Sequence, residues 1–98
     1  MIPGIEYRTT ERYDGKSVYT MLINAGAITA SGEITKRIQG LTSGIRYAGR
    51  VGPCPVPVLQ TTQIYVDTYE NNVTIGWVCG HEDWIGRPVE CQLWYLKD

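Results

Sequence analysis

The residues with the most obvious chemical potential lie in one short stretch of the chain. Residues 79–83 read Cys-Gly-His-Glu-Asp, and Cys91 follows further along. Cysteine, histidine and carboxylate side chains are the usual zinc ligands, but this spacing matches no closed four-ligand motif. A fourth ligand would have to come from Cys54, across a proline-rich connector. We therefore expect no metal site and no cofactor.

Catalysis is the second use to which these residues could be put. Cys79 and His81 could act as a nucleophile and its base if a third group oriented the histidine. On one strand the two side chains would share a face, but the neighbouring glycine and acidic loop offer no preorganised oxyanion hole. Asp14, Glu82 and Asp83 could supply a carboxylate pair for glycoside cleavage. Solvated turn acids explain them more simply, so we expect no catalytic residues and no enzymatic activity.

The cysteines are better explained by packing than by chemistry. Their number is three, which is odd and too small for a disulfide scaffold. A strand cysteine usually packs as a small hydrophobe, so we expect Cys79 and Cys91 to be buried free thiols. A disulfide between these two residues stays open as an alternative, because it needs paired strands and an oxidising environment.

Two predicted loops combine an aromatic ring with polar side chains, which is a combination suited to saccharides. An aromatic face can stack on the apolar side of a sugar ring, while carboxylates and amides hydrogen-bond to its hydroxyls. The candidate ligand-binding residues are Trp84, His81, Glu82 and Asp83 in one loop and Tyr69, Asn71 and Asn72 in the other. In the alternative interpretation, Trp84 and Ile85 fold back over the end of the domain.

Assembly with other chains is a third class of function. A trimer must bury an apolar patch of each chain against its neighbours, and outward strand faces bearing aromatic residues are the candidates. These candidate interface residues are Tyr65, Trp77, Trp94 and Tyr95. Trp94 and Tyr95 are adjacent, so in a regular strand they point to opposite faces. One of the two must enter the core, and the other must be covered or exposed.

Composition limits the domain organisation and the partners. The 98 residues, of which 43% are hydrophobic, suffice for one domain spanning residues 1–98 with a single small core. Nine basic residues against ten acidic ones give a net charge of -1, which provides no field to attract nucleic acid. The chain lacks an apolar run of about 18 residues, so we expect no membrane insertion. Seven Tyr and three Trp, with no Phe, suit surfaces that are partly buried and partly wet.

Turn and strand signals along the chain predict an all-β fold. Asp14-Gly15 is typical of a tight hairpin turn, and the Asn71-Asn72 pair supplies the left-handed backbone that a second hairpin needs. The expected strands cover residues 7–13, 17–23, 45–51, 61–68, 73–78 and 89–96. About six or more strands in hairpin order predict an antiparallel β-sandwich or a jelly-roll-like fold.

Three other segments carry weaker signals. Residues 29–32 are small and polar, which indicates a loop. Residues 33–38 space their isoleucines four apart, which fits a helical turn as well as an irregular strand. Residues 53–57 carry proline at alternate positions and predict an extended connector or an edge strand.

The N-terminal run resembles a recurring segment of known proteins. Residues 7–19 (YRTTERYDGKSVY) resemble a segment in tail-fibre and baseplate proteins of phages and prophages of Gram-positive bacteria. In that family a TTERYDGK run leads into a strand ending near GAL, matched here by residues 26–28 (GAI). Further on, residues 38–41 lie where the family often has an HGI step, with Gln39 in place of the histidine. Residues 89–97 resemble its closing strand.

The resemblance implies a setting and a task. It implies a β-sandwich that is the C-terminal module of a longer protein, at the tip of a trimeric fibre in the virion tail, assembled in the bacterial cytoplasm. The implied partners are a host cell-surface saccharide or protein, other virion tail proteins, and further copies of the chain in a homotrimer. We expect non-enzymatic receptor binding. The alternative is a structural module for trimerisation or virion assembly that has no receptor site of its own.

Overall fold

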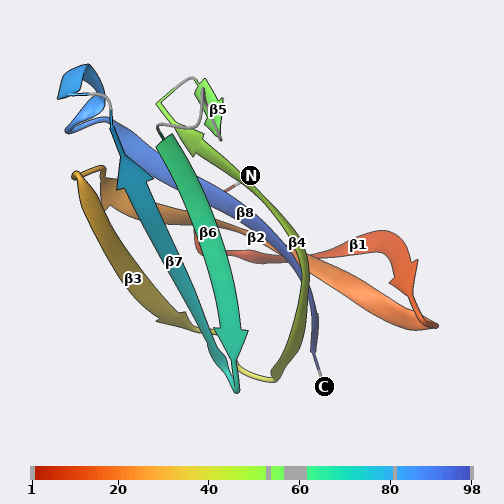
Figure 1. Ribbon diagram of the computed structural model, residues 1–98. Helices are drawn as coiled ribbons and strands as arrows, with labels where there is room; N and C mark the ends of the chain where they lie inside the picture. Colours follow the sequence, from red (N-terminus) through yellow and green to blue (C-terminus); the bar gives the residue numbers. More distant parts are fainter. Residues whose placement is uncertain (1, 53, 57–61, 81, 98) are drawn as a thin grey trace.

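Eight strands form two antiparallel sheets in the computed structural model, which describes residues 2–52, 54–56, 62–80 and 82–97 (Figure 1). The strands are β1 (Glu6–Tyr13), β2 (Lys16–Ala27), β3 (Ser31–Arg37), β4 (Leu41–Val51), β5 (Cys54–Val56), β6 (Thr62–Tyr69), β7 (Asn72–Cys79) and β8 (Pro88–Lys97). A short 3-10 helix, η1 (Glu82–Trp84), lies between β7 and β8. In these ranges we find no helix that could span a membrane.

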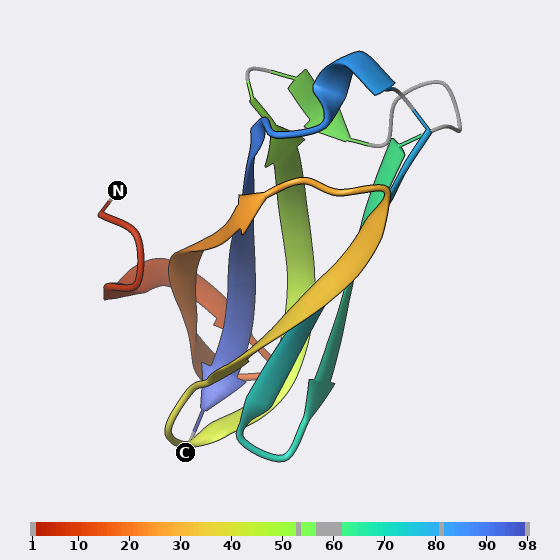
Figure 2. The same cartoon turned by 90° about the vertical axis from the view of Figure 1, so that its left-hand side faces the viewer.

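A five-stranded sheet packs face to face on a three-stranded sheet (Figure 2). The strand order is β1-β2-β8-β4-β5 in the larger sheet and β3-β7-β6 in the smaller one. β2 pairs with β8 and β3 pairs with β7, so the chain folds back on itself in nested antiparallel pairs. The predicted all-β sandwich is therefore confirmed.

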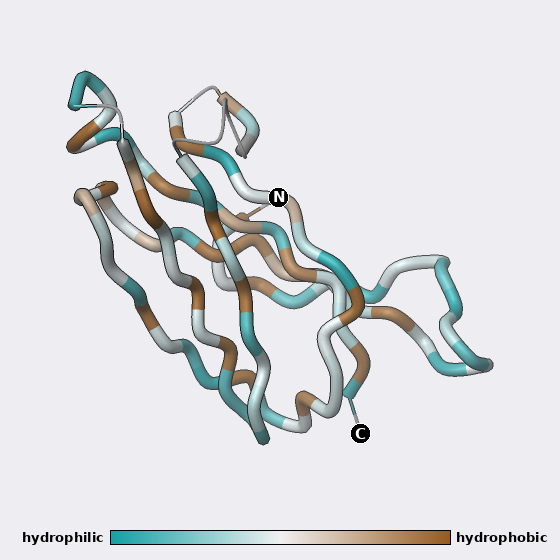
Figure 3. Tube along the Cα trace, viewed as in Figure 1, coloured by the Kyte–Doolittle hydropathy of each residue, from teal (hydrophilic) through white to brown (hydrophobic). Residues whose placement is uncertain are grey.

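The core lies between the two sheets and follows from strand alternation. Every second residue of a strand points to the same face, so the apolar positions of β7 and β8 meet across the sandwich. The positions concerned are Val73, Ile75, Trp77 and Cys79 on β7 and Val89, Cys91, Leu93 and Tyr95 on β8, all of them buried. The same alternation is visible as bands of hydrophobic and hydrophilic colour along the strands (Figure 3).

Two of the predicted interface residues belong to this core. Trp77 is 5% exposed and Tyr95 is 0% exposed, so the interface role predicted for these two residues is wrong. Each finds a partner for its polar atom inside the protein, which removes the penalty for burial. Trp77 Nε1 donates to Thr29 Oγ1 at 3.2 Å, and the Tyr95 hydroxyl donates to Glu6 Oε2. Trp94 is the outward member of its pair and is half-buried.

The two hairpin turns differ in the residues that take positive φ. In the first, Asp14 and Gly15 have φ of 52° and 79°, as a type I′ turn requires. In the second, Tyr69 pairs with Asn72, and the positive φ of 55° belongs to Glu70. The prediction that the asparagines supply the left-handed backbone of this turn is therefore wrong.

The segments with weaker signals also form strands. Residues 33–38 lie mostly in β3, because pairing with β7 favours the extended form. The predicted loop over residues 29–32 ends early, since β3 begins at Ser31, and the strand predicted at residues 45–51 begins at Leu41. The described part of the proline-rich segment is β5, an edge strand, as predicted.

Cys79 and Cys91 are buried thiols outside any disulfide, as predicted. They belong to β7 and β8, which lie in different sheets. A disulfide between paired strands, the alternative left open by the sequence, is therefore not formed.

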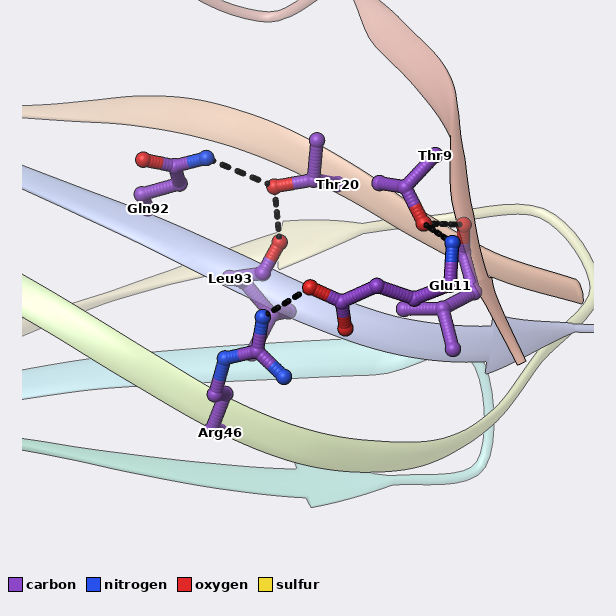
Figure 4. A network of polar contacts seen from close by, with 7 residues as sticks. Thr9, Glu11, Thr20, Arg46, Gln92 and Leu93 are labelled. Atoms are coloured by element: carbon purple, nitrogen blue, oxygen red, sulfur yellow. Dashed lines mark hydrogen bonds and ion pairs between the residues drawn. The ribbon is translucent and has the colours of Figure 1, made fainter. Parts of the chain in front are cut away.

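The tip of the β1–β2 hairpin projects beyond the sandwich (Figure 1), and Glu11 of this hairpin reaches across β8 toward Arg46 of β4 (Figure 4). The register shift between Arg8 and Arg12 leaves residues 9–11 opposite Val18 alone, which is a β-bulge. Thr9 Oγ1 holds the bulge, because it donates to the Val18 carbonyl at 2.7 Å and accepts from the Glu11 N–H at 3.1 Å. The bend brings Glu11 within 2.6 Å of Arg46 on β4, although two strands separate β1 from β4 in the sheet.

A second buried cluster lies on the outer face of the five-stranded sheet. Val18, Thr20 and Leu96 are buried but lie outside the cluster between the sheets. Thr20 Oγ1 donates to the Leu93 carbonyl at 2.9 Å and accepts from Gln92 Nε2 at 3.0 Å. These three outward positions are closed to solvent, whereas the outward positions 46, 48 and 50 of β4 stay exposed.

Candidate functional site

The two predicted ligand-binding loops lie at opposite ends of β7. The turn at residues 69–72 precedes this strand, and η1 follows it (Figure 1). The eight residues of β7 span about 23 Å at the usual rise of a strand. The structure therefore does not bring the two predicted loops together into one site.

Trp84 does not offer a free ring. The side chain is half-buried and packs against the core cluster. The Arg87 guanidinium lies over the ring, 5.0 Å from its centroid. Of the alternative interpretation, in which Trp84 and Ile85 fold back over the end of the sandwich, the structure shows the part that concerns Trp84, whereas Ile85 is exposed. Glu82 and Asp83 are exposed in η1, and His81 lies outside the described residues.

Burial limits the chemistry that was considered for the cysteines. Within the described ranges, no three His, Cys, Asp or Glu residues are grouped so that they could hold a metal ion. Burial raises the pKa of the Cys91 thiol to about 12. Since the thiolate is the reactive form of cysteine, Cys91 acts as a packing residue.

The outer face of the three-stranded sheet brings together several predicted residues instead. Strand alternation directs Tyr65 and Tyr69 of β6 and Asn72 of β7 to this face. The register aligns four rows across β6, β7 and β3: Gln63–Val78–Ser31, Tyr65–Gly76–Glu33, Asp67–Thr74–Thr35 and Tyr69–Asn72–Arg37. We call these four rows the Tyr65 face.

Tyr65 lies across its partner Gly76 at the centre of this face. The ring atoms Cε2 and Cζ and the hydroxyl occupy the space that a Cβ on Gly76 would need. Only glycine allows a ring to lie down on the neighbouring strand in this way. Tyr65 is 48% exposed, so the side of the ring that faces away from Gly76 is open to solvent.

Hydrogen-bonding side chains surround the open ring. Gln63 and Asp67 lie on either side of Tyr65 along β6, and both are exposed. Glu33 on β3 lies in the same row, on the side toward which the Tyr65 ring extends. The amide and the two carboxylates can accept or donate hydrogen bonds around the ring. The arrangement combines a flat apolar surface with polar groups at its edge.

The sequence identified only part of this face. Tyr69 and Asn72 were predicted as ligand-binding residues and Tyr65 as an interface residue, whereas Asn71 lies in the adjoining turn. Gln63, Asp67, Glu33 and Gly76 were not predicted. The available signal was a glycine inside a β-branched strand, because such a glycine often marks a close approach by another group.

Comparison of the chain with protein-family models, with curated proteins and with solved structures found no match.

Proposed function

We propose that this chain is a non-enzymatic module that binds a saccharide of the bacterial cell surface, at the tip of a phage tail fibre or baseplate. The observation that carries the proposal is Tyr65, whose ring lies across Gly76 with one side open. A sugar ring presents an apolar side that stacks on such a surface and hydroxyls that reach the polar edge. The tail-fibre setting rests on the resemblance of residues 7–19.

Binding at one such site is expected to be weak. The Tyr65 face is a sheet surface and not an enclosed pocket, so it covers only one side of a sugar. A fibre tip presents several copies of the site, and effective concentration converts weak single contacts into firm attachment. A homotrimeric tip would therefore adhere to a cell even though each copy binds its saccharide loosely.

The test is binding of the whole chain to immobilised bacterial cell-wall glycans, with the protein displayed on streptavidin to supply multivalency. Tyr65→Ala should lower binding at least about tenfold, the equivalent of about 1.4 kcal/mol. Tyr13→Ala is the matched control, because Tyr13 is an exposed tyrosine at the tip of the β1–β2 hairpin. Absence of binding by the wild type to every glycan would contradict the proposal.

A second candidate function, assembly with other tail chains, is favoured by an open strand edge. β5 pairs only with Gly49–Val51 of β4, so the rest of β4 has no described strand on the side away from β8. A cleft of about 390 Å³, lined by Ile45, Tyr47 and Val66 among others, lies beside this edge. A strand edge that no described strand covers, next to a cleft of mixed polar and apolar lining, can accept a strand from another chain.

Light scattering on a sizing column tests this second function. A trimer that becomes a monomer on Tyr47→Lys would support strand addition at β4, because an edge lysine opposes pairing. Wild-type protein that is monomeric at every concentration would contradict it.

A further inference from the structure

We infer that the Tyr65 face selects an uncharged oligosaccharide lying along β6 and disfavours anionic polymers such as poly(glycerol phosphate). The inference rests on the proposed function and adds the class of ligand. It comes from the charges near Tyr65 and from the position of a second exposed tyrosine on the same strand.

The charge around the ring is negative and uncompensated. The row of Tyr65 and the rows on either side contain two carboxylates, Glu33 and Asp67, and no lysine or arginine. Both carboxylates are exposed, and neither forms an ion pair with another described residue. Arg37 is the one basic residue of the Tyr65 face, and it lies in the end row with Tyr69.

This charge acts directly on a ligand stacked on Tyr65. Asp67 is two residues from Tyr65 along β6, about 7 Å, and Glu33 is one strand, about 5 Å, from Gly76, over which the ring lies. Both distances are shorter than the Debye length of about 8 Å at physiological salt, so screening is incomplete. A phosphate group over the ring would meet two like charges without a cation to offset them. A neutral sugar meets two hydrogen-bond acceptors instead.

The orientation of the ligand follows from Tyr69. This residue is 73% exposed and points to the same side of β6 as Tyr65, four residues further on. Four strand residues span about 13 Å, which is longer than one sugar ring. Asp67 lies between the two tyrosines. A chain of several sugars can therefore contact both rings and the carboxylate between them, whereas a monosaccharide contacts only one ring.

Selection of a neutral polymer over an anionic one is a difference between two affinities. The test therefore measures the ratio of the two dissociation constants. The whole chain, displayed on streptavidin, is titrated onto a neutral cell-wall polysaccharide and onto poly(glycerol phosphate). The test variant is Glu33→Gln with Asp67→Asn, which removes both charges and keeps the side-chain shapes. The control is Glu82→Gln with Asp83→Asn, which makes the same charge change in η1, at the end of the sandwich.

The wild type should bind the neutral polymer at least about tenfold more tightly than the phosphate polymer. The Glu33/Asp67 variant should lower this ratio by about tenfold, and the Glu82/Asp83 control should leave it unchanged. An equal change in both variants, or equal wild-type binding to both polymers, would overturn the inference and leave the proposed function intact. Absence of wild-type binding to both polymers, together with an empty glycan array, would refute the proposed function itself.

Discussion

The ring of Tyr65 on β6 takes the place of the side chain that its cross-strand partner Gly76 on β7 lacks. As a result, the aromatic ring of Tyr65 lies flat on the sheet. Most exposed tyrosines instead extend away from the sheet into solvent. Because Gly76 lies on the inner strand of the three-stranded sheet, the platform is held on both sides by paired strands. A rigid aromatic surface loses little conformational entropy when a ligand binds.

Gly76→Ala should displace the ring of Tyr65 without unfolding the domain. Gly76 does not have a positive φ, so alanine fits the backbone, and the atoms in its way belong to a movable side chain. We expect the free energy of unfolding to change by less than about 1 kcal/mol. Glycan binding should fall at least about fivefold, which is about 1 kcal/mol. Urea titration and glycan titration of the same preparation measure the two effects.

A double-mutant cycle identifies the cause of that loss. In a Tyr65→Ala background, Gly76→Ala should have no further effect on binding, because the ring that it displaces is already absent. Additive losses would show that Gly76 acts on binding independently of Tyr65.

Glu70→Gly should stabilise the protein. Glu70 has a φ of 55° in the two-residue loop between β6 and β7. A left-handed backbone is unfavourable for residues with a Cβ and free of that cost for glycine, so we expect a gain of about 0.5–1 kcal/mol. Asn71→Gly is the control, since Asn71 does not have a positive φ and gains nothing. Equal effects of the two substitutions in urea titrations would contradict this explanation.

Thr9→Val should weaken the bend of the β1–β2 hairpin. The substitution removes the hydroxyl that bonds to both the Val18 carbonyl and the Glu11 N–H. We expect the free energy of unfolding to fall by about 1–2 kcal/mol, as for the loss of two modest hydrogen bonds. Thr10→Val, one residue along in the same bulge, should have a smaller effect. If thermal unfolding shows the two variants to be equally stable, the hydroxyl of Thr9 does not hold the bulge.

Alkaline pH should destabilise the fold through Cys91. Burial raises the pKa of its thiol from 9.0 to about 12. Because the thiol pKa is higher in the folded state than in the unfolded state, the protonated thiol contributes to the free energy of unfolding. This contribution is complete below pH 9 and is lost as the pH rises toward 12. At about 1.4 kcal/mol for each of the three pH units, the free energy of unfolding should fall by about 4 kcal/mol.

Cys91→Ala isolates this contribution. The variant should start less stable at pH 7, because it leaves a small void, but should lose less stability than the wild type between pH 9 and pH 12. Tyr95, whose pKa is also raised, chiefly by burial, remains in both proteins and cancels from the comparison. Urea titrations across this pH range would contradict the assignment if the two proteins lost stability in parallel.

Local signals in the sequence were sufficient for the strands but not for the face that each residue occupies. Asp14-Gly15 predicts the first hairpin because the turn chemistry lies within the turn itself. Adjacency of Trp94 and Tyr95 predicts opposite faces but not which residue is inside. The inward Tyr95 donates a hydrogen bond from its hydroxyl to Glu6, which lies 89 residues away in the sequence and so outside any local pattern. The Glu11–Arg46 pair likewise requires the bend at Thr9, which no local pattern predicts.

The candidate site shows the same limit. The sequence pointed to aromatic residues beside polar ones, and Tyr65, Tyr69 and Asn72 meet that description on one face. Trp84 meets it too, but Arg87 and the core cover its ring. Which aromatic is open and which is covered follows from the packing of the sheets, and this is not encoded in the spacing of residues along one strand.

Mapping the binding site by NMR tests the central claim most directly. The ¹⁵N-labelled chain is titrated with a neutral cell-wall oligosaccharide, and amide shifts are followed residue by residue. The account predicts that the largest shifts fall on Tyr65, Gly76 and Glu33 and on their neighbours in the Tyr65 face. Shifts confined to η1 or to the β1–β2 hairpin would contradict it, because they would place the ligand on a different part of the sandwich.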